Sequence, residues 1–481
     1  MAEEIDLVTV KSRAVKGMAT LTGGGVIITL ITGVGVLILT TVLGPKEFGL
    51  YGLVGSIVVI LGYFSDIGLA ASLIQKKEAL TNIDLRTTFT IQQTLVLFLT
   101  MVVFAASPWI KSYYNLQGPE YWLLLALLFS FVISSLKSIP SVMLERSLRF
   151  DLIMIVRIVE TFVFNIIVVT MALRGNGVFS YVPAVISQSL IGLILIYIFK
   201  PWPLGIAFSK ESLKKLLKFG VPYQTNSLIA VAKDQFVNLF LWKIIGTAGM
   251  GYVNWGFYYS QMPQRLIMDN ATRVAFPALS RMQDHPDEFR KSTERLLKFI
   301  CLIIFPSLVG IALLWSHLAY LVPKWTKWQP ALIPLYLYCF SAILSCFSTP
   351  LTNTLYALGK AKIVTYLMVM WLVLEWLLKP TLAIRYGYVG IAYAAAIIAF
   401  SSFVPFFIAK KIIGFSAIKS LGAVTVSAIL MAIVGVLSYR LGIITAVALA
   451  CATYAAGVSL LGGKQLLTEI KPFLVHFRAK V

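Results

Sequence analysis

Residues 20–68 read TLTGGGVIITLITGVGVLILTTVLGPKEFGLYGLVGSIVVILGYFSDIG and contain two long apolar runs. They predict membrane-spanning helices over 17–43 and 46–65, because roughly 20 apolar residues in a helix cross a hydrocarbon core of about 30 Å. Similar runs recur along all 481 residues, of which 59% are hydrophobic and only 13% are charged. This composition is too apolar for a soluble protein, and the runs are about twice the length of a barrel strand. We therefore predict an all-α polytopic membrane protein.

The apolar runs predict about fourteen transmembrane helices. After the first two, the predicted spans are 84–106, 121–143, 152–173, 178–199, 219–244, 250–270, 296–318, 330–357, 363–384, 389–409, 418–438 and 443–462. Lys and Arg are concentrated in every second loop, beginning with Lys11, Arg13 and Lys16. The positive-inside rule therefore places both termini in the cytoplasm. We expect the chain in the cytoplasmic (inner) membrane. Adding or removing one pair of helices keeps this orientation, so totals from twelve to fourteen fit.

The segment 200–218, KPWPLGIAFSKESLKKLLK, divides the chain. Two prolines precede a basic amphipathic stretch suited to a membrane surface, which predicts a cytoplasmic linker between two lobes. The sequence after it repeats the start at an offset of 202, so that Gly44 matches Gly246 and Gly49 matches Gly251. Such repeats predict two pseudo-symmetric lobes of six helices each. The predicted parts are an N-lobe over 1–199, a C-lobe over 219–410, and two further helices with a basic tail over 411–481.

Six ionisable side chains fall inside predicted spans, where each costs a few kcal/mol unless it has a partner, a polar cavity or a route to the surface. They are Lys137 in the fourth span, Arg157 and Glu160 in the fifth, Lys233 and Asp234 in the seventh, and Arg265 in the eighth. By helical rise, Arg157 lies about 8 Å and Glu160 about 12 Å from the start of their span. One interpretation is a cationic cavity that binds lipid-carrier phosphates, with Arg157, Lys233, Lys137 and Arg265 as its candidates.

The alternative is internal ion pairing, in which Arg157, Glu160 and Lys137 pair among themselves and Lys233 pairs with groups near Asp234. For Lys137 and Arg265, snorkelling toward the headgroups is a further alternative. The carboxylates Glu160 and Asp234 are candidates for coupling to H+ or Na+, because a buried carboxylate binds such cations unless a fixed cation already pairs with it.

Other membrane-embedded residues have plainer interpretations. Glu375 and Lys379, four residues apart, predict a structural ion pair. Five tryptophans are typical of an interfacial aromatic belt, with stacking on sugar rings as the alternative: Trp315, Trp325, Trp328, Trp371 and Trp376.

Several classes of function have no support in the sequence. It has no G-x-x-x-x-G-K-[ST] loop, no G-x-S-x-G elbow and no H-E-x-x-H motif, so we predict that the protein is not an enzyme. His285, His317 and His476 lack ligand spacing, so neither a metal nor a cofactor is predicted. The net charge of +21 follows the loops and therefore reflects topology, so no nucleic-acid partner is expected.

Five segments together resemble the polysaccharide-exporter (Wzx-type) branch of the MOP flippases. They are LGPKEFGLYGLV at 43–54, SDIGLAASLIQKK at 65–77, LERSLRF at 144–150, AFPALSRMQDHPDEF at 275–289 and YALGKAK at 356–362. The resemblance implies two lobes in an inward-open V, alternating access, and a polyprenyl-pyrophosphate-linked oligosaccharide as cargo. It also implies contact with membrane lipids and with a polysaccharide polymerase or assembly proteins. Asp66 and Gly68 match the D-x-G-L motif, which suggests a turn or a gate.

Two other functions compete with a lipid-linked oligosaccharide flippase. The first is a cation-coupled multidrug exporter of the same fold. The second, less favoured, is a membrane glycan polymerase or ligase, which the short non-cytoplasmic loops leave little room for.

Overall fold

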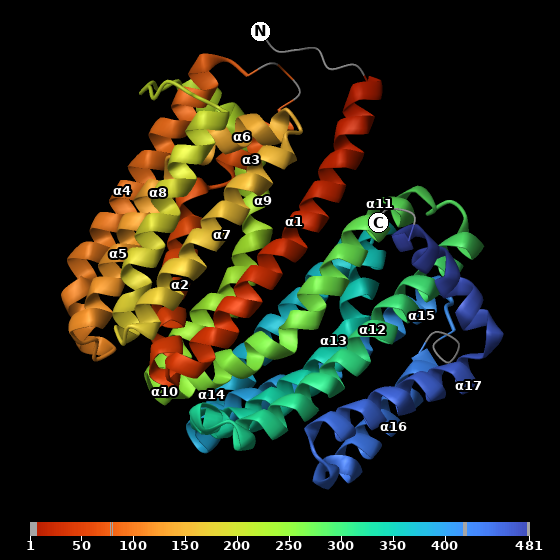
Figure 1. Cartoon of the computed structure of the whole chain (residues 1–481). Coiled ribbons are helices and arrows are strands. Elements are labelled where there is room, and N and C mark those ends of the chain that lie inside the picture. Colours follow the sequence, from red (N-terminus) through yellow and green to blue (C-terminus); the bar gives the residue numbers. More distant parts are fainter. Residues whose placement is uncertain (1–6, 77, 79, 417–420, 479–481) are drawn as a thin grey trace. The chain divides into compact units, whose positions relative to one another are not determined.

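The computed structural model describes residues 7–76, 78, 80–416 and 421–478, and these contain helices and no strand (Figure 1). The chain forms two compact units, Met1–Gly251 and Tyr252–Val481. The first unit contains α1 (Leu7–Val42), α2 (Pro45–Asp66), α3 (Leu69–Gln75), α4 (Asn82–Tyr113), α5 (Gly118–Ser135), α6 (Ser138–Arg146), α7 (Phe150–Leu173), η1 (Gly177–Ser180), α8 (Tyr181–Phe199), α9 (Lys210–Val231), η2 (Ala232–Phe236) and the start of α10 (Val237–Pro263). The second contains the rest of α10, then η3 (Gln264–Met268), α11 (Asp269–Arg281), α12 (Pro286–Leu321), η4 (Pro323–Ala331), α13 (Leu332–Ala357), α14 (Ala361–Ala399), η5 (Phe400–Ser402), α15 (Phe403–Ile413), α16 (Ala423–Leu437), η7 (Ser438–Leu441) and α17 (Ile443–Arg478).

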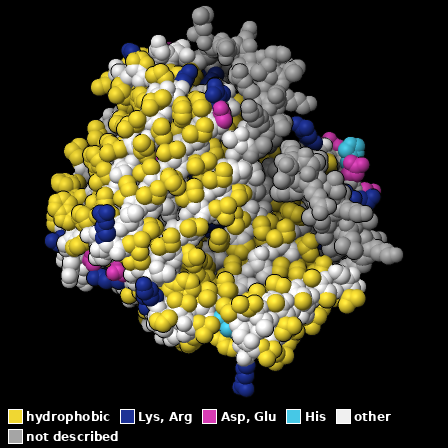
Figure 2. Space-filling view, in the orientation of Figure 1, with side chains coloured by type: hydrophobic (Ala, Val, Ile, Leu, Met, Phe, Trp, Pro, Cys, Tyr) yellow, Lys and Arg dark blue, Asp and Glu magenta, His cyan; other side chains and the backbone are white. Residues whose placement is uncertain are grey.

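The predicted all-α membrane architecture is confirmed. Among the described residues, 12 helical segments are long and apolar enough to cross a membrane. Figure 2 shows hydrophobic side chains over most of the face in view, with few charged side chains among them. Leu97, Phe98 and Met101 of α4 illustrate this surface, because all three are large and exposed. A surface of this kind is stable against lipid chains and not against water.

Two of the twelve segments are about twice as long as a bilayer requires. Ala232–Arg281 has 50 residues and Ala361–Ile413 has 53. Each contains one residue with non-helical backbone, Gly246 with φ 72° and Gly387 with φ 61°. If the chain crosses twice in each segment, the total is fourteen, and that count remains a prediction.

One predicted span, 121–143, is broken in the structure. Helix α5 ends at Ser135 and α6 begins at Ser138, so Lys137 lies in the break and not inside a continuous helix. The physical reason is Pro140, which cannot donate a hydrogen bond to the carbonyl of Leu136 and whose ring clashes with that carbonyl in a regular helix. The interpretation of Lys137 as a residue within the fourth helix was therefore wrong.

The repeat offset of 202 reappears as a reciprocal contact in the first unit. A Cβ atom at Gly49 would lie 1.8 Å from the carbonyl oxygen of Thr247, and one at Gly251 would lie 1.8 Å from that of Pro45. Pro45 and Thr247 are themselves 202 residues apart, so equivalent positions of the two repeats touch each other. By packing, residues up to Gly251 belong to the first unit, whereas the sequence places the lobe boundary at the linker 200–218.

The second unit contains a cluster of packed aromatic rings. Trp255, Trp315 and Trp328 are at most 3% exposed, with Trp255 stacked on Trp328 at 5.2 Å between centroids. The ring of Trp315 meets that of Trp255 at 4.6 Å in an edge geometry. Offset and edge contacts of this kind stabilise aromatic cores. The prediction of an interfacial belt is therefore wrong for Trp315 and Trp328, which lie inside the unit.

Candidate functional site

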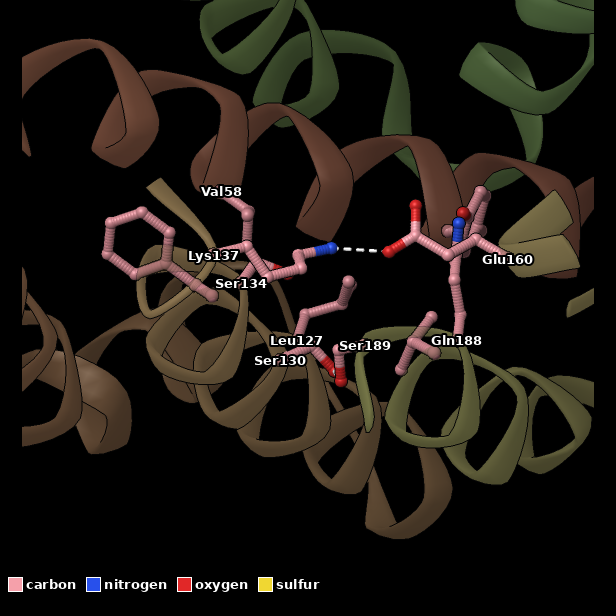
Figure 3. Close-up of a pocket in the computed structure, with 11 residues that line it drawn as sticks. Val58, Leu127, Ser130, Ser134, Lys137, Glu160, Gln188 and Ser189 are labelled. Carbon is pink, nitrogen blue, oxygen red and sulfur yellow. Dashed lines mark hydrogen bonds and ion pairs between the residues drawn. The ribbon is translucent and has the colours of Figure 1, made fainter. Parts of the chain in front are cut away.

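A cavity of about 210 Å³ lies inside the first unit (Figure 3). Helices α2, α5, α7 and α8 supply its walls together with the break after α5. The lining residues are Tyr51, Val58, Leu127, Ser130, Phe131, Ser134, Lys137, Glu160, Val185, Gln188 and Ser189. Hydroxyl and amide groups from α5 and α8 make the wall partly polar, although the surrounding helix surfaces are apolar. Such a cavity can hold charge at membrane depth, which a purely apolar bundle cannot.

The cavity contains an ion pair between helices. The ammonium of Lys137 donates a hydrogen bond to the Glu160 carboxylate, as Figure 3 shows. The two side chains are 18% and 13% exposed, so both are mostly withdrawn from solvent. They are 23 residues apart in sequence, and the break that Pro140 imposes after α5 puts Lys137 within reach of α7. Lys137 is therefore neither unpaired nor snorkelling, and internal pairing describes it.

Gly192 on α8 leaves room for this carboxylate. A Cβ atom at Gly192 would lie 1.5 Å from Oε1 of Glu160, the oxygen that accepts from Lys137. The carboxylate therefore rests against the α8 backbone, and any larger residue would displace it. This role was not predicted from the sequence, because nothing in it relates position 192 to position 160.

Arg157 does not join the pair. Its side chain is exposed, and among the described residues it has no carboxylate within ion-pair distance. The i, i+3 spacing of Arg157 and Glu160 allows an ion pair, but Glu160 is turned toward Lys137 instead. The carboxyl group of Glu145, at the end of α6, feels the positive charge of Arg157. Burial raises the pKa of Glu145, and this charge lowers it by a smaller amount.

Lys233 and Asp234 lie in η2, a π-helical turn between α9 and α10. Lys233 Nζ lies 2.5 Å from Asp234 Oδ1, and the two side chains are 27% and 51% exposed. Neighbouring residues do not face each other on a regular α-helix, and π-helical turns occur frequently at functional sites. The structure brings these two charges together, as internal pairing predicts, but leaves them accessible.

Arg265 lies in the second unit, in the π-helical turn η3. Its side chain is exposed, and its guanidinium carbon lies 5.8 Å from the ring centroid of Tyr258. A contact of this length is a cation–π interaction, which stabilises the charge without neutralising it. Arg265 is thus held by an aromatic ring and remains available to an anion.

Asp66 and Gly68 form the turn between α2 and α3. Ile67 and Gly68 both have left-handed backbone, with φ of 48° and 76°. Asp66 Oδ1 accepts a hydrogen bond from the backbone N–H of Ala70 at 3.1 Å and so caps the start of α3. These contacts describe a capped turn.

The buried carboxylate of Asp84 was not predicted from the sequence. Asp84, at the start of α4, is 4% exposed and accepts hydrogen bonds from Lys76, Thr81 and Ser212. The sequence does indicate a role for Asp84 at a helix start, because Thr81 and Asp84 form a capping box of the T-x-x-D type. The long-range contact with Ser212 has no such signal.

The chain is similar to known membrane and polysaccharide biosynthesis proteins. A family model described as "Polysaccharide biosynthesis protein" matches residues 38–330. The "Uncharacterized membrane protein in cps region" of Klebsiella pneumoniae is 25% identical over 365 residues, which cover 75% of this chain and 73% of that protein. The lipopolysaccharide biosynthesis protein WzxC of Escherichia coli (strain K12) is 25% identical over 343 residues, which cover 69% and 68%.

A solved structure matches nearly the whole chain. The lipid II flippase MurJ, in an inward closed conformation, aligns with a TM-score of 0.72 and covers 94% of this chain and 100% of that one. The identity is 13%, so this likeness shows the fold alone.

Proposed function

Because the chain belongs to the polysaccharide biosynthesis protein family, we propose that it is a flippase for an anionic lipid-linked oligosaccharide. It carries the polyprenyl-pyrophosphate-linked cargo from the cytoplasmic to the outer leaflet, for assembly of a surface polysaccharide. The resemblance to the Wzx-type branch of the MOP flippases is confirmed by the family model and the relatives. The chain is a multi-pass membrane transporter and not an enzyme.

The exposed guanidinium of Arg157 is the observation that carries the proposal for the cargo's charge. An arginine at this depth is costly against lipid chains, so it must face a polar path or an anion. Its planar fork binds phosphate oxygens through two parallel hydrogen bonds, which favours a pyrophosphate over a neutral ligand. Lys233 and Arg265, both accessible and both on π-helical turns, support the same conclusion.

Alternating access moves the headgroup across while the polyprenyl tail stays in lipid. Both chain termini face the cytoplasm in this scheme, as the loop charges predict. Glu160 and Asp234 remain the candidates for coupling to H+ or Na+, but each already has a lysine partner. Coupling therefore requires H+ or Na+ to compete with a lysine ammonium for the carboxylate. Translocation driven by the concentration difference of the cargo requires no such competition.

The competing function is a cation-coupled multidrug exporter. The cavity of the first unit favours it in one respect, because Tyr51 and Phe131 line it beside the Glu160 carboxylate. Aromatic rings and a carboxylate are the groups that bind organic cations. Lys137 opposes it, because its ammonium occupies that carboxylate. If a deletion strain lost dye efflux but kept its surface glycan, that result would establish the multidrug exporter.

Surface glycan measured in a deletion strain tests the flippase directly. We expect Arg157→Ala and Lys233→Ala to reduce export while the protein level stays constant, and Arg157→Lys to keep part of it. Lys111→Ala, which removes a cation from the last turn of α4 and not from α7 or η2, is the control and should leave export unchanged. Full export by the Arg157→Ala, Lys233→Ala double variant would contradict the assignment of these residues to the cargo.

A further inference from the structure

Helices α3 and α9 lie side by side in the first unit (Figure 1). Two direct contacts and a third link through Asp84 of α4 keep one register between them. On α3 and its two caps, the contacting residues are four apart and therefore share one face. On α9 the spacing is also four, running in the opposite direction. We call these three pairs the α3–α9 zipper: Gly68 with Gly220, Ser72 with Leu216, and Lys76 with Ser212.

The first two pairs bring the helices very close. A Cβ atom at Gly68 would lie 2.3 Å from the carbonyl oxygen of Gly220, so no side chain fits there. The left-handed backbone of Gly68, with φ 76°, also favours glycine. One turn further, Ser72 Oγ donates a hydrogen bond to the backbone carbonyl of Leu216 at 2.8 Å.

The third pair is bridged by Asp84. One carboxylate oxygen of Asp84 accepts from Ser212 Oγ at 2.5 Å, and the other accepts from Lys76 Nζ at 2.7 Å. Thr81 donates to the same carboxylate at 2.7 Å. A buried carboxylate with three donors is fully satisfied and costly to disrupt. The bridge therefore fixes the start of α9 against the ends of α3 and α4.

The chain before α9 is held in place as well. Trp202 is 6% exposed and packs its ring edge-on against Phe89, with 5.1 Å between centroids. The backbone N–H groups of Ala207 and Ser209 donate to hydroxyls on α4, at 3.2 Å and 3.1 Å. The predicted surface linker is thus fastened to the first unit along its length.

Helix α3 is itself fixed at its C-terminal end by Arg146. The guanidinium donates hydrogen bonds to the carbonyls of Leu73 at 2.8 Å and Glu78 at 2.6 Å, and also to that of Lys76. Carbonyls in and after the last turn of a helix need donors from outside it, and the arginine supplies them as a C-terminal cap. A short helix that is capped at both ends is a rigid support for α9.

Helix α9 leads without interruption into η2, which carries Lys233. From Gly220 to Lys233 the helical rise amounts to about 20 Å. A slip of one residue in the register would rotate Lys233 by about 100° around the helix axis. The depth and direction of Lys233 are therefore determined by where α9 is fastened.

We infer that the α3–α9 zipper is a positioning device for Lys233 and that it stays closed throughout the transport cycle. On this inference, the D-x-G-L segment at Asp66–Leu69 is the site where α9 packs, and it is not a gate that opens. The role assigned to Lys233 rests on the proposed function, whereas the permanence of the contact does not.

Cross-linking tests whether the zipper must open. In a chain with all four cysteines replaced by alanine, we would join Ser72→Cys to Leu216→Cys with a short bifunctional thiol reagent. Ser72→Cys with Lys214→Cys, whose side chain is exposed two residues away, is the matched control and should not cross-link. We expect the cross-linked 72–216 protein to keep most of the surface glycan export of its untreated form. Loss of export on cross-linking would overturn the inference and make the contact a gate.

Labelling of a cysteine at position 233 tests positioning without any transport assay. In a Lys233→Cys chain, we expect Gly68→Ala to change the rate of maleimide labelling by about threefold or more, the effect of losing one or two close contacts. Gly55→Ala, where nothing lies within 4 Å, should leave that rate unchanged. Ser72→Ala serves as the milder variant if Gly68→Ala does not fold. Equal rates in all of these chains would contradict positioning, even if export by the wild-type chain also failed and the proposed function with it.

Discussion

In the part of the chain that the structure describes, each unit contains one lysine–glutamate pair with both side chains mostly buried, and the two pairs are built differently. Lys137 and Glu160 are 18% and 13% exposed, and Lys379 and Glu375 are each 15% exposed, so burial is nearly equal. The first pair joins the break after α5 to α7 across 23 residues, whereas the second joins positions i and i+4 of α14. The local pair forms whenever α14 is helical. The long-range pair forms only in the assembled bundle, and it faces a cavity.

The difference separates an ion pair that depends on the assembled bundle from one that depends only on its own helix. Helices persist in the unfolded state of a membrane protein, so an i, i+4 pair exists in both states and adds little to the stability of the fold. A long-range pair is lost on unfolding, and its position between helices makes it sensitive to their movement. We therefore regard Lys137 and Glu160 as a contact that depends on the assembled bundle, and Glu375 and Lys379 as a stabilised segment of helix.

Glu160→Gln should produce the largest effect. It leaves the Lys137 ammonium without a carboxylate in a mostly buried site, which we expect to cost about 2–4 kcal/mol. The measurement is the free energy of unfolding in mixed detergent micelles. Adding Lys137→Met should recover most of the loss, because the unpaired charge is then removed. A single variant as stable as the wild type would show that the pair does not hold α7 in place.

Gly192→Ala should produce the next effect, because it disturbs the same pair without removing a charge. The added methyl group would overlap Oε1 of Glu160, so the carboxylate must move away from Lys137. We expect a loss of about 1–2 kcal/mol in the same unfolding assay. Gly62→Ala on α2 has nothing within 4 Å of the new methyl and is the matched control. Equal losses from both alanine variants would mean that the effect is unrelated to the pair.

Glu375→Gln tests the local pair of α14 in the same way. Since its pair is local to α14, we expect a loss below about 1 kcal/mol and no change in surface glycan export. A loss as large as that from Glu160→Gln would remove the distinction between the two pairs.

The smallest effect concerns pH and Glu145, which lies near the end of α6 and outside the candidate membrane spans. Burial raises its pKa above the ordinary value of 4.5, so the folded state binds this proton more tightly than the unfolded state. The free energy of unfolding therefore declines as the pH rises from the pKa of Glu145 in the unfolded state to its higher pKa in the folded state. Glu145→Gln should flatten this dependence by less than about 1 kcal/mol between pH 4 and pH 8. An unchanged pH profile would mean that another group controls this range.

Much of the fold could be predicted from the sequence, because apolar length and loop charge act locally. The spans, the helical class and the repeat offset all follow from such patterns, and the reciprocal contact of Gly49 and Gly251 agrees with the offset. The break at Lys137 was also readable, since Pro140 stands four residues after Leu136. The predicted span 121–143 nevertheless ran through this position, because apolar residues continue on both sides of it.

The candidate site was predicted less completely, because its contacts join distant segments. The six embedded charges were identified from the sequence, which left both Arg157 and Lys137 as possible partners for Glu160. Only the packing of α5, α7 and α8 decides between them. The docking of the linker through Asp84 and Ser212 is likewise a long-range contact that periodicity does not contain.

The most direct measurement is translocation by the purified chain in proteoliposomes loaded with a polyprenyl-pyrophosphate-linked oligosaccharide. Accessibility of the glycan to an impermeant glycan-modifying enzyme reports the leaflet it occupies. The proposed function predicts that the wild-type chain moves the glycan between leaflets and that the Arg157→Ala, Lys233→Ala variant does so much more slowly. If the wild-type chain left the glycan in its original leaflet, or extended it instead, that result would contradict the proposal.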